Sequence, residues 1–390
     1  MKVGFLYNHD ALHQISHTAP VIAELVRHAG VEVTVLTSSP NQEARVRLLI
    51  GDAATSVRFV DLRIGRVAEA LDRGLRFVAP FRRVAVLREN LSAFAALDVL
   101  VTPETTSLLL RDRFGLVGLK FVWIPHGAGD RSVGFRPVMR GFDLVLLSGT
   151  KVRDRMLAGG LLRPDNHAVI GYPKFDTIED APPPPRLFDN DRPTVLYNPH
   201  FDPLLSSWYT MGQDVIEWFA GQSRFNLIFA PHVMLFQRRL HASVEHRLIR
   251  WRREVPARYC GLPHIIVDRG STRSIDMTYT RAADIYLGDA SSQIYEWIVR
   301  PRPAIFLDAS GADWRGNADF AHWQLGDVVR EITDLPAALD RALTQPDAYR
   351  AAQEAARSAT FLRSDIPASQ RAADAIVQWF QAKPTLTTTP

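Results

Sequence analysis

A chain of 390 residues, of which 46% are hydrophobic and 23% charged, has the composition of a globular protein and the length of two domains or one large one. Its single cysteine, Cys260, excludes a disulfide framework and any metal site built from several cysteines, so we expect a reducing compartment, the cytoplasm. The formal net charge of +4 is accompanied by no nucleic-acid-binding motif, and we therefore expect no nucleic-acid partner.

Strand and helix patterns alternate through the first part of the chain. Its opening residues lead directly into a strand rather than a signal peptide, and no run approaches the ~20 apolar residues of a membrane span. A helix is expected at 18–29, ended by Gly30, and strands are expected at 2–7, 31–36, 57–60, 98–101, 120–124 and 144–147. This alternation predicts βαβ units and a parallel sheet.

The loop after the first strand contains His9, His13 and His17, spaced four residues apart. On a helix they would share one face and could bind a metal, but Asp10 is the only acidic residue among them, so we predict no metal site. Loops at the carboxyl ends of parallel strands are where α/β proteins bind ligands. We therefore assign His13 to the rim of a substrate cleft.

Arginines alternate with apolar residues between positions 63 and 88, as in a basic amphipathic helix. Such a helix could lie on an anionic membrane surface, which would make the protein peripheral to the inner face of the cytoplasmic membrane. A solvated helix packed on the core explains the pattern equally well. A second basic run, 238–258 around Trp251, leaves the same two interpretations open.

Residues 179–193, EDAPPPPRLFDNDRP, are rich in proline and acidic side chains and predict an interdomain linker. We therefore expect an N-terminal Rossmann-like domain at 1–178, a second domain at 194–365, and a C-terminal helix and tail at 366–390. After the linker, strands are expected at 194–197, 227–229, 265–267, 285–287 and 304–307, and helices near 213–219 and at 368–381. The tail at 385–390 is expected to be frayed.

The stretch 282–308, AADIYLGDASSQIYEWIVRPRPAIFLD, predicts a strand, a tight turn, a helix at 293–299 and a further strand. Ser291 or Ser292 is well placed to cap that helix. Free amides behind a cap, together with the helix dipole, favour an anion such as phosphate. A capped helix without a ligand is the other interpretation of the same residues.

Three strands are followed at once by a Pro-His pair, which contributes His126, His200 and His232. Proline cannot continue a ladder inside a sheet, so each pair marks the carboxyl end of a strand, the ligand edge of an α/β sheet. Histidine is the usual acid or base near neutral pH, which favours a functional interpretation over three structural turns. A fourth pair precedes its strand, and we assign its histidine, His264, no role.

Two glycine-containing loops follow predicted strands. In His126-Gly127-Ala128-Gly129-Asp130 the glycines would allow a charged substrate to approach the backbone closely, although a plain glycine turn also explains them. In the loop 170–176, IGYPKFD, Gly171 and Lys174 would suit phosphate, and a plain entry into the linker is equally consistent. No Walker loop, Rossmann glycine fingerprint, HExxH or GxSxG element is present.

In their order and spacing these motifs resemble the CDP-glycerol glycerophosphotransferase family, which builds teichoic-acid-like polymers of glycerol phosphate. The resemblance covers about 123–308. Its pieces are His126-Gly127, the loop 171–176, the strand into Asn198-Pro199, Pro231-His232, and Asp289-Ala290-Ser291-Ser292 followed by Arg302-Pro303. It implies an α/β protein of the GT-B type, two Rossmann-like domains facing a cleft, with the nucleotide held mainly by the second domain and the acceptor by the first.

The chain departs from the family's pattern at two places. The family usually has threonine and proline after its His-Gly, where this chain has Ala128 and Gly129. It often flanks its second histidine with a basic residue and a proline, where this chain has Ala230 and Val233. These differences leave open the acceptor and, to a lesser degree, the donor head group.

The resemblance implies transfer of glycerol phosphate, or a related alcohol phosphate, from a CDP-linked donor to a hydroxyl of a glycan or lipid acceptor, in cell-envelope polymer synthesis and without a cofactor. It makes His126 the base and His232 the group that stabilises charge on the leaving group. The donor-binding candidates are Ser291, Ser292, Asp289, Glu296, Gly171, Pro173, Lys174, Asn198 and His200, and the acceptor-side candidates are Gly127, Asp130 and His13. Glu296 is expected to reach a ribose or glycerol hydroxyl.

Two alternatives keep the fold and change the function. One is a GT-B glycosyltransferase or nucleotide-sugar epimerase that uses a UDP- or GDP-sugar. The other is a catalytically silent GT-B module that binds a nucleotide or a partner protein.

Overall fold

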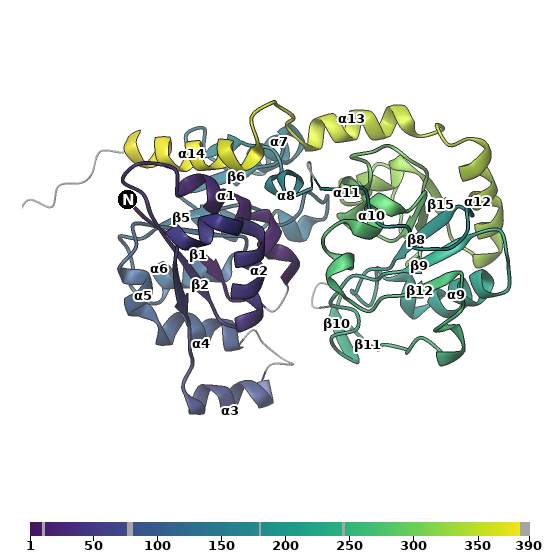
Figure 1. Ribbon diagram of the computed structural model, residues 1–390, viewed down its shortest axis with the longest axis horizontal. Coiled ribbons are helices and arrows are strands. Elements are labelled where there is room, and N and C mark those ends of the chain that lie inside the picture. Colours follow the sequence, from purple (N-terminus) through teal and green to yellow (C-terminus); the bar gives the residue numbers. More distant parts are fainter. Residues whose placement is uncertain (10–11, 76–80, 179–180, 244–245, 383–390) are drawn as a thin grey trace, which may run out of the picture. The chain divides into compact units, whose positions relative to one another are not determined.

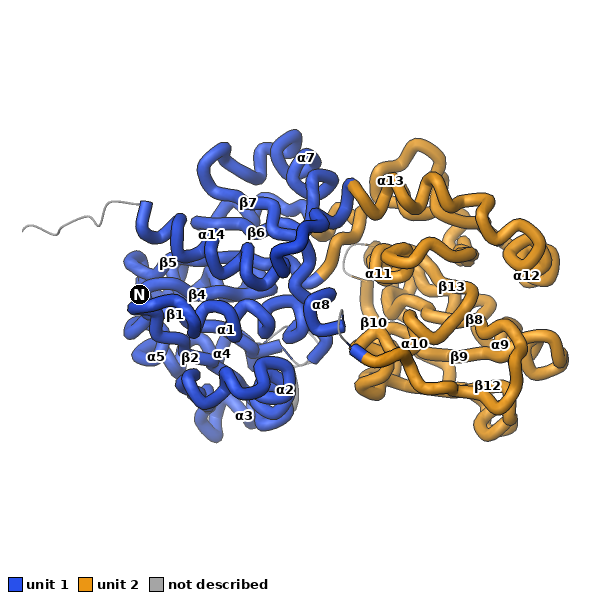
Figure 2. Tube along the Cα trace, turned by 45° about the horizontal axis from the view of Figure 1, so that its top comes forward, with its two compact units in different colours: residues 1–126, 135–181, 359–390 blue, residues 127–134, 182–358 orange. Residues whose placement is uncertain are grey.

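A computed structural model describes residues 1–9, 12–75, 81–178, 181–243 and 246–382, and the chain forms two compact units (Figure 2). The first unit contains residues 1–126, 135–181 and 359–390, and the second contains 127–134 and 182–358. These limits differ from the predicted domains 1–178 and 194–365, because 127–134 joins the second unit and the segment after 358 joins the first.

Seven parallel strands form the sheet of the first unit, in the order β3-β2-β1-β4-β5-β6-β7 (Figure 1). The strands are β1 Lys2–Tyr7, β2 Glu32–Thr37, β3 Arg58–Asp61, β4 Val99–Thr102, β5 Lys120–Trp123, β6 Leu144–Leu147 and β7 His167–Val169. β4 and β6 are buried at every position, as expected for a parallel sheet that helices cover on both faces.

The helices of the first unit come from both ends of the chain. They are α1 Ala19–Leu25, α2 Pro40–Ile50, α3 Arg66–Leu75, α4 Phe81–Glu89, α5 Leu91–Ala95, α6 Leu109–Asp112, α7 Thr150–Ala158, α8 Pro173–Asp176 and α14 Ala368–Ala382. Ala372 and Ile376 of α14 are fully buried in the same hydrophobic cluster as Val3 and Phe5 of β1. The carboxylate of Asp176 accepts hydrogen bonds from the amides of Ala368 (3.2 Å) and Ser369 (2.6 Å), so α8 caps the start of α14.

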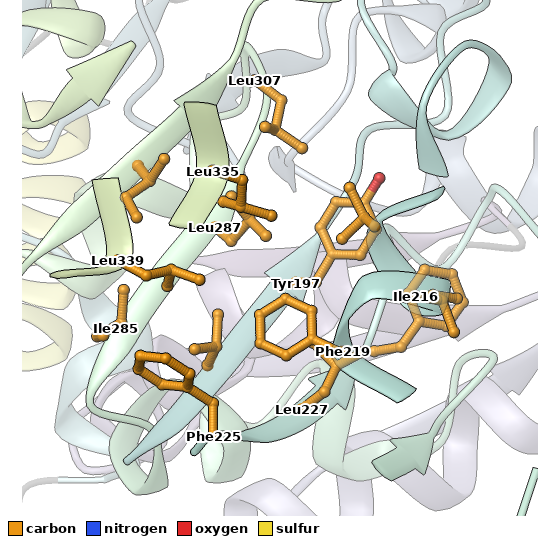
Figure 3. Packing of buried hydrophobic residues seen from close by; sticks show 14 of the residues in the cluster. Tyr197, Ile216, Phe219, Phe225, Leu227, Ile285, Leu287, Leu307, Leu335 and Leu339 are labelled. Carbon is orange, nitrogen blue, oxygen red and sulfur yellow. The ribbon is translucent and has the colours of Figure 1, made fainter. Parts of the chain in front are cut away.

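Six parallel strands form the main sheet of the second unit, in the order β12-β9-β8-β13-β14-β15. They are β8 Thr194–Asn198, β9 Asn226–Phe229, β12 Ile265–Val267, β13 Ile285–Gly288, β14 Ala304–Leu307 and β15 Asp327–Val329; the helices are α9 Gly212–Ala220, α10 Thr278–Ala282, α11 Gln293–Trp297 and α12 Leu335–Thr344. α13, Arg350–Thr360, runs across the boundary between the units. Figure 3 shows the core on one face of this sheet, where Tyr197 and Leu287 of the central strands pack with Phe219 of α9 and Leu339 of α12.

Both sheets have the Rossmann strand order. In each, the first strand along the chain lies inside the sheet, and the second and third extend to one side. The remaining strands, four in the first sheet and three in the second, extend to the other side. The order therefore reverses between β1 and β4 in the first unit and between β8 and β13 in the second. Ligands of such sheets bind outside the carboxyl ends of the strands at this point of reversal.

The predicted strands are confirmed, most of them within one residue at each end. Four strands were not predicted: the edge strands β7 and β15 and the hairpin strands β10 (Leu240–Ser243) and β11 (Leu248–Trp251). The predicted helix 18–29 ends early, at Leu25, while Gly30 has the positive φ of +75° that favours glycine. Between Asp176 and Thr194 the described residues form no regular element, as expected for 179–193, and the predicted tail 385–390 lies outside the described residues.

The single amphipathic helix predicted at 63–88 is wrong. The structure has two helices there, α3 and α4, and residues 76–80 between them lie outside the described part of the chain. The sequence has Pro80 between the two, and a proline is not tolerated in a helix interior. Across the described residues, no helix is both long and apolar enough to cross a membrane.

Candidate functional site

Histidines from distant parts of the chain gather at the carboxyl edge of the first sheet. His126 follows β5, and His13 and His17 lie in a 3₁₀ turn, Leu12–His17, after β1. The ring centroids of His13 and His17 lie 6.0 and 6.4 Å from that of His126. Tyr172, which follows β7, lies edge-on to His17 at 5.0 Å. The predicted positions of His13 and His126 at this edge are confirmed.

A backbone hydrogen bond fixes the proton of His126. Its Nδ1 lies 3.1 Å from the carbonyl oxygen of Pro103, which can only accept. Nδ1 therefore donates, and in the neutral ring Nε2 holds the lone pair. The side chain is open to solvent, yet protein around the ring removes part of its hydration and lowers its pKa, against a smaller opposing effect of the Pro103 hydrogen bond. His126 is thus an accessible neutral base at pH 7.

The candidates of the loop 170–176 lie in the same unit. Lys174 is buried, and its positive charge adds to burial in holding the pKa of His17 well below its usual range. Gly171 has a φ of +88°, and a Cβ there would lie 2.8 Å from the carbonyl oxygen of Leu362. This close packing requires glycine whether or not a phosphate binds. Pro173 opens α8, where its missing N–H has no helical partner to lose.

In the second unit, Asp289 joins the two strand ends at the point of reversal. It follows β13, and its Oδ2 accepts hydrogen bonds from the amides of His200 (2.7 Å), which follows β8, and Ser207 (3.0 Å). Its Oδ1 is buried without a hydrogen-bond partner among the described residues. Burial raises the pKa of the Asp289 carboxyl to about 7, and the hydrogen bonds from Ser207 and His200 oppose that rise.

The serine pair does not cap a helix in the predicted way. Ser292 occupies the cap position of α11 but its side chain makes no capping hydrogen bond, while the Oγ of Ser291 accepts from the amide of Gln293 at 3.2 Å. α11 spans five residues rather than the predicted 293–299, because the chain leaves helical geometry at Ile298. The expected support of a helix dipole for a phosphate is therefore not provided by α11.

Gly127 and Gly129 pack against the serine turn. A Cβ on Gly129 would lie 3.0 Å from Cβ of Ser292, and one on Gly127 would lie 3.3 Å from its Oγ. The glycines therefore allow the chain to pass close to Ser292. The predicted approach of a substrate to them remains a prediction.

A buried carboxylate fixes this glycine loop to the second unit. Oδ2 of Asp130 accepts hydrogen bonds from the hydroxyl of Tyr295 (2.6 Å) and from the amide (3.1 Å) and Nδ1 (3.0 Å) of His322. Tyr295 belongs to α11, and His322 lies in the 3₁₀ segment Ala318–Leu325. His322 is 1% exposed, and its Nε2 has no hydrogen-bond partner within the described residues.

Asp130 and Gly127 were expected in the N-terminal domain. They belong to the second unit because Asp130 is hydrogen-bonded to Tyr295 and His322 and Gly127 packs against Ser292. The acceptor-side role expected of them is still a prediction. Sequence reasoning missed Tyr295 and His322, since they lie 165 and 192 residues from Asp130 and no local pattern connects them.

Two Pro-His pairs of the second unit lie side by side at the ends of β8 and β9. The rings of His200 and His232 are 5.5 Å apart, and Asn198 links the strand ends by donating to the carbonyl of Ala230 at 2.6 Å. His264 instead precedes β12 at the opposite edge, with Nε2 3.1 Å from the carbonyl of Phe219. The predicted edges of all three histidines are confirmed.

The proton positions of His200 and His232 are the reverse of that in His126. Nδ1 of His200 accepts from the amide of Asp202 (3.1 Å), and Nδ1 of His232 accepts from the amide of Met234 (3.3 Å). A nitrogen that accepts has no proton, so each neutral ring presents Nε2–H as a donor. Burial, followed by the charges of His232, Arg131 and His322, holds the pKa of His200 well below its usual range. The pair can donate to an anionic oxygen.

Glu296 is buried on α11 and accepts a hydrogen bond from Nε2 of Gln293 at 3.0 Å. Its expected contact with a ribose or glycerol hydroxyl remains a prediction. In the described parts of the chain, no group of three or more His, Cys, Asp and Glu side chains is arranged to hold a metal ion.

No protein-family profile and no curated protein matches the chain. Solved structures match it along almost its whole length. A UDP-N-acetylglucosamine 2-epimerase from Listeria monocytogenes, itself assigned by inference, superposes with a TM-score of 0.63 at 15% identity, over 98% of this chain and 97% of the other. The S. aureus MnaA–UDP complex superposes with 0.63 at 13% identity, over 100% and 98%.

A variant of the wall teichoic acid polymerase TagF superposes with a TM-score of 0.60 at 12% identity, over 97% of this chain and 88% of the other. The chain has the GT-B fold. The predicted fold class, α/β with two Rossmann-like domains, is thereby confirmed. At such low identities the likeness concerns the fold alone.

We expect the stability of the protein to depend on pH through Asp289. Its folded-state pKa of about 7 lies above the unfolded value of about 3.9, so the folded state retains a proton that the unfolded state loses. Stability from this group is therefore full below about pH 4 and falls as the pH rises to about 7. Asp289→Asn, which cannot ionise, should become steadily more stable relative to the wild type over this range, as urea unfolding at several pH values would measure.

A constant difference between the Asp289→Asn variant and the wild type from pH 4 to 7 would contradict this assignment. Because other titrating groups are common to both proteins, the difference isolates Asp289.

Tyr295→Phe should destabilise the protein by about 1–3 kcal/mol, since it removes a short hydrogen bond to a buried carboxylate. Urea unfolding would measure the loss. Tyr349→Phe is the control, because Tyr349 donates to Asp327, which also receives Arg341. An equal loss of unfolding free energy in the two variants would contradict the expectation that the buried hydrogen bond to Asp130 contributes more than the partly exposed one to Asp327.

Proposed function

We propose that the protein is a transferase that moves glycerol phosphate, or a related alcohol phosphate, from a CDP-linked donor to a hydroxyl of a glycan or lipid acceptor in cell-envelope polymer synthesis. The observation that carries the proposal is the complementary proton placement of the Pro-His histidines. His126 presents a basic nitrogen, and His200 and His232 present N–H donors. Transfer of a phosphoryl group needs a base for the incoming hydroxyl and donors for the departing phosphate.

In the proposed step, the acceptor hydroxyl gives its proton to Nε2 of His126 while its oxygen attacks the phosphorus that bears the glycerol. The bond from that phosphorus to the bridging oxygen of the diphosphate breaks, and CMP leaves with the electron pair. Nε2–H of His232, with that of His200, donates to the phosphate that leaves. The Nδ1 hydrogen bond to Pro103 supports the imidazolium that forms on His126.

The remaining candidates take supporting roles in this proposal. The hydroxyls of Ser291 and Ser292 would bind donor phosphate, and Glu296 would bind a ribose or glycerol hydroxyl. Asp289 and Asn198 hold the strand ends on which these groups lie. Lys174, with Gly171 and Pro173, and His13 line the same carboxyl edge as His126, where a charged substrate group would bind.

Two further observations bear on the choice of function. The motif resemblance between 123 and 308 and the fold likeness to a teichoic acid polymerase support the transferase. The fold likeness to UDP-N-acetylglucosamine 2-epimerases supports the second candidate, an epimerase or glycosyltransferase that uses a sugar nucleotide. We propose a cytoplasmic location for either, where nucleotide-linked donors are made.

His126→Ala should lower kcat for transfer from CDP-glycerol by about 10²- to 10⁴-fold, the usual contribution of a general base. Donor affinity should change little, because His126 acts on the acceptor. Activity of the wild type should decline on the acid side of pH 6.5, since the lowered pKa of His126 keeps the ring neutral down to there. Product release from CDP-glycerol with a panel of glycan and lipid acceptors would measure these effects.

His264→Ala is the matched control, because this Pro-His histidine lies at the opposite edge of its sheet. It should retain transfer activity. Full activity of His126→Ala would remove the proposed base.

His232→Ala should weaken the binding of CDP-glycerol and of CMP, because it deletes the Nε2–H that, in this proposal, donates to the departing phosphate. A loss of about tenfold is expected for one charge-assisted hydrogen bond. Calorimetry with CDP-glycerol, UDP-sugars and GDP-sugars would measure it and rank the donors. A clear preference for a sugar nucleotide would favour the second candidate, and tight binding without turnover on any acceptor would favour a silent module.

A further inference from the structure

An antiparallel hairpin replaces the usual crossover helix between two neighbouring strands of the second unit. β9 and β12 pair in parallel, and the described residues between them form no α-helix. They form instead β10 (Leu240–Ser243) and β11 (Leu248–Trp251), which make a two-stranded sheet of their own. Figure 1 draws this hairpin at the periphery of the second unit.

The hairpin has its apolar face outward. Leu240 pairs with Trp251, and Ala242 pairs with Ile249, so these four side chains share one face. The exposed fractions are 44% for Leu240, 63% for Ile249 and 71% for Trp251. A surface hairpin normally turns such residues toward the core and its polar residues toward water. In this hairpin the apolar side chains face water, and His241 and Ser243 are buried.

Polar contacts on the inner face hold the hairpin in this orientation. Nε2 of His241 lies 3.0 Å from the carbonyl oxygens of both Leu235 and Arg238, and it donates because carbonyls only accept. Arg252, just after β11, donates to the carbonyl of Arg238 (3.2 Å) and to Glu254 (2.7 Å). Its guanidinium also lies 4.2 Å from the ring of Phe236. These hydrogen bonds of His241 and Arg252 hold the polar face of the hairpin inward, and its apolar face is therefore directed outward.

Positive charge surrounds the apolar face. Residues 238–253 include six arginines and one glutamate. Arg238, Arg239, Arg247 and Arg253 are exposed, and in the described part of the chain none of the four forms an ion pair within 4 Å. Glu254 is already engaged by Arg252. The arginines are thus available to an anionic partner.

We propose that the outward face of the β10–β11 hairpin docks the protein on the surface of an anionic lipid bilayer. Leu240, Ile249 and Trp251 would enter the interfacial region, where tryptophan is enriched, and the flanking arginines would contact headgroup phosphates. A protein partner fits less well, because a stable interface takes about 20–30 residues from each side and the apolar face offers four side chains.

Docking through the hairpin has a consequence for the second unit. Residues 230–239 alone connect β10 to the end of β9, where His232 lies. The bilayer surface would therefore approach the carboxyl edge of the second sheet. Docking through this face is independent of the proposed transfer reaction.

Sedimentation with lipid vesicles tests the proposal. The full chain should bind vesicles of phosphatidylcholine with phosphatidylglycerol, bind pure phosphatidylcholine weakly, and be released by salt. The double variant Ile249→Ser with Trp251→Ser should lower partitioning at least about tenfold, since two apolar side chains no longer leave water. Arg238→Gln with Arg239→Gln should lower it about fivefold for each arginine removed.

Val117→Ser is the matched control, because Val117 of the first unit is 76% exposed and lies away from the hairpin in the chain. It should bind vesicles like the wild type, and thermal unfolding should show that all variants fold. Absence of binding at low salt, or equal binding by the Ile249→Ser, Trp251→Ser protein, would overturn the proposal. So would a self-association of the wild type in sedimentation velocity that the double variant abolishes without any vesicle binding, since a second copy would then be the occupant.

Discussion

The hydrogen bonds of one buried carboxylate hold the candidate site of the second unit together. Asp289 accepts the amides of His200 and Ser207, and so connects the ends of the two strands between which the sheet order reverses. The strands themselves pair as far as Asn198 and Gly288, and Asp289 continues the connection into the two loops that follow. The bridge fixes the backbone at His200, and the amide of Asp202 then orients the His200 ring. Its second oxygen is buried without a hydrogen-bond partner among the described residues.

Backbone geometry rather than side-chain chemistry decides what each Pro-His histidine can do. After β8 and β9 the ring nitrogen accepts an amide two residues further on, whereas after β5 it donates to a carbonyl from another strand end. The same dipeptide therefore yields two donors and one base. Proline has a part in this result, because it ends the strand and sets the histidine at the edge of the sheet. Proton placement is thus a property of the fold.

The sequence predicted what depends on local pattern. Apolar runs located the strands, and the Pro-His pairs located their carboxyl ends. It could not predict contacts between distant segments, such as those of Asp130 with Tyr295 and His322, which help to explain why 127–134 belongs to the second unit. Nor could it show that the hairpin around Trp251 would turn its apolar side outward, since alternation predicts two faces without telling which is buried. The single helix predicted at 63–88 is wrong because the amphipathic pattern continues across Pro80, where a helix cannot.

The position of α14 has a consequence for how the chain is made. Ala372 and Ile376 pack in the same core as the residues of β1, and the carboxylate of Asp176 accepts hydrogen bonds from the amides of Ala368 and Ser369. A ribosome delivers these partners after the whole of the second unit has emerged. The first unit therefore begins its synthesis before the second unit but completes its hydrophobic core after it. The part of its core that α14 covers stays uncovered until α14 leaves the ribosome, when all strands of the second unit have already been synthesised.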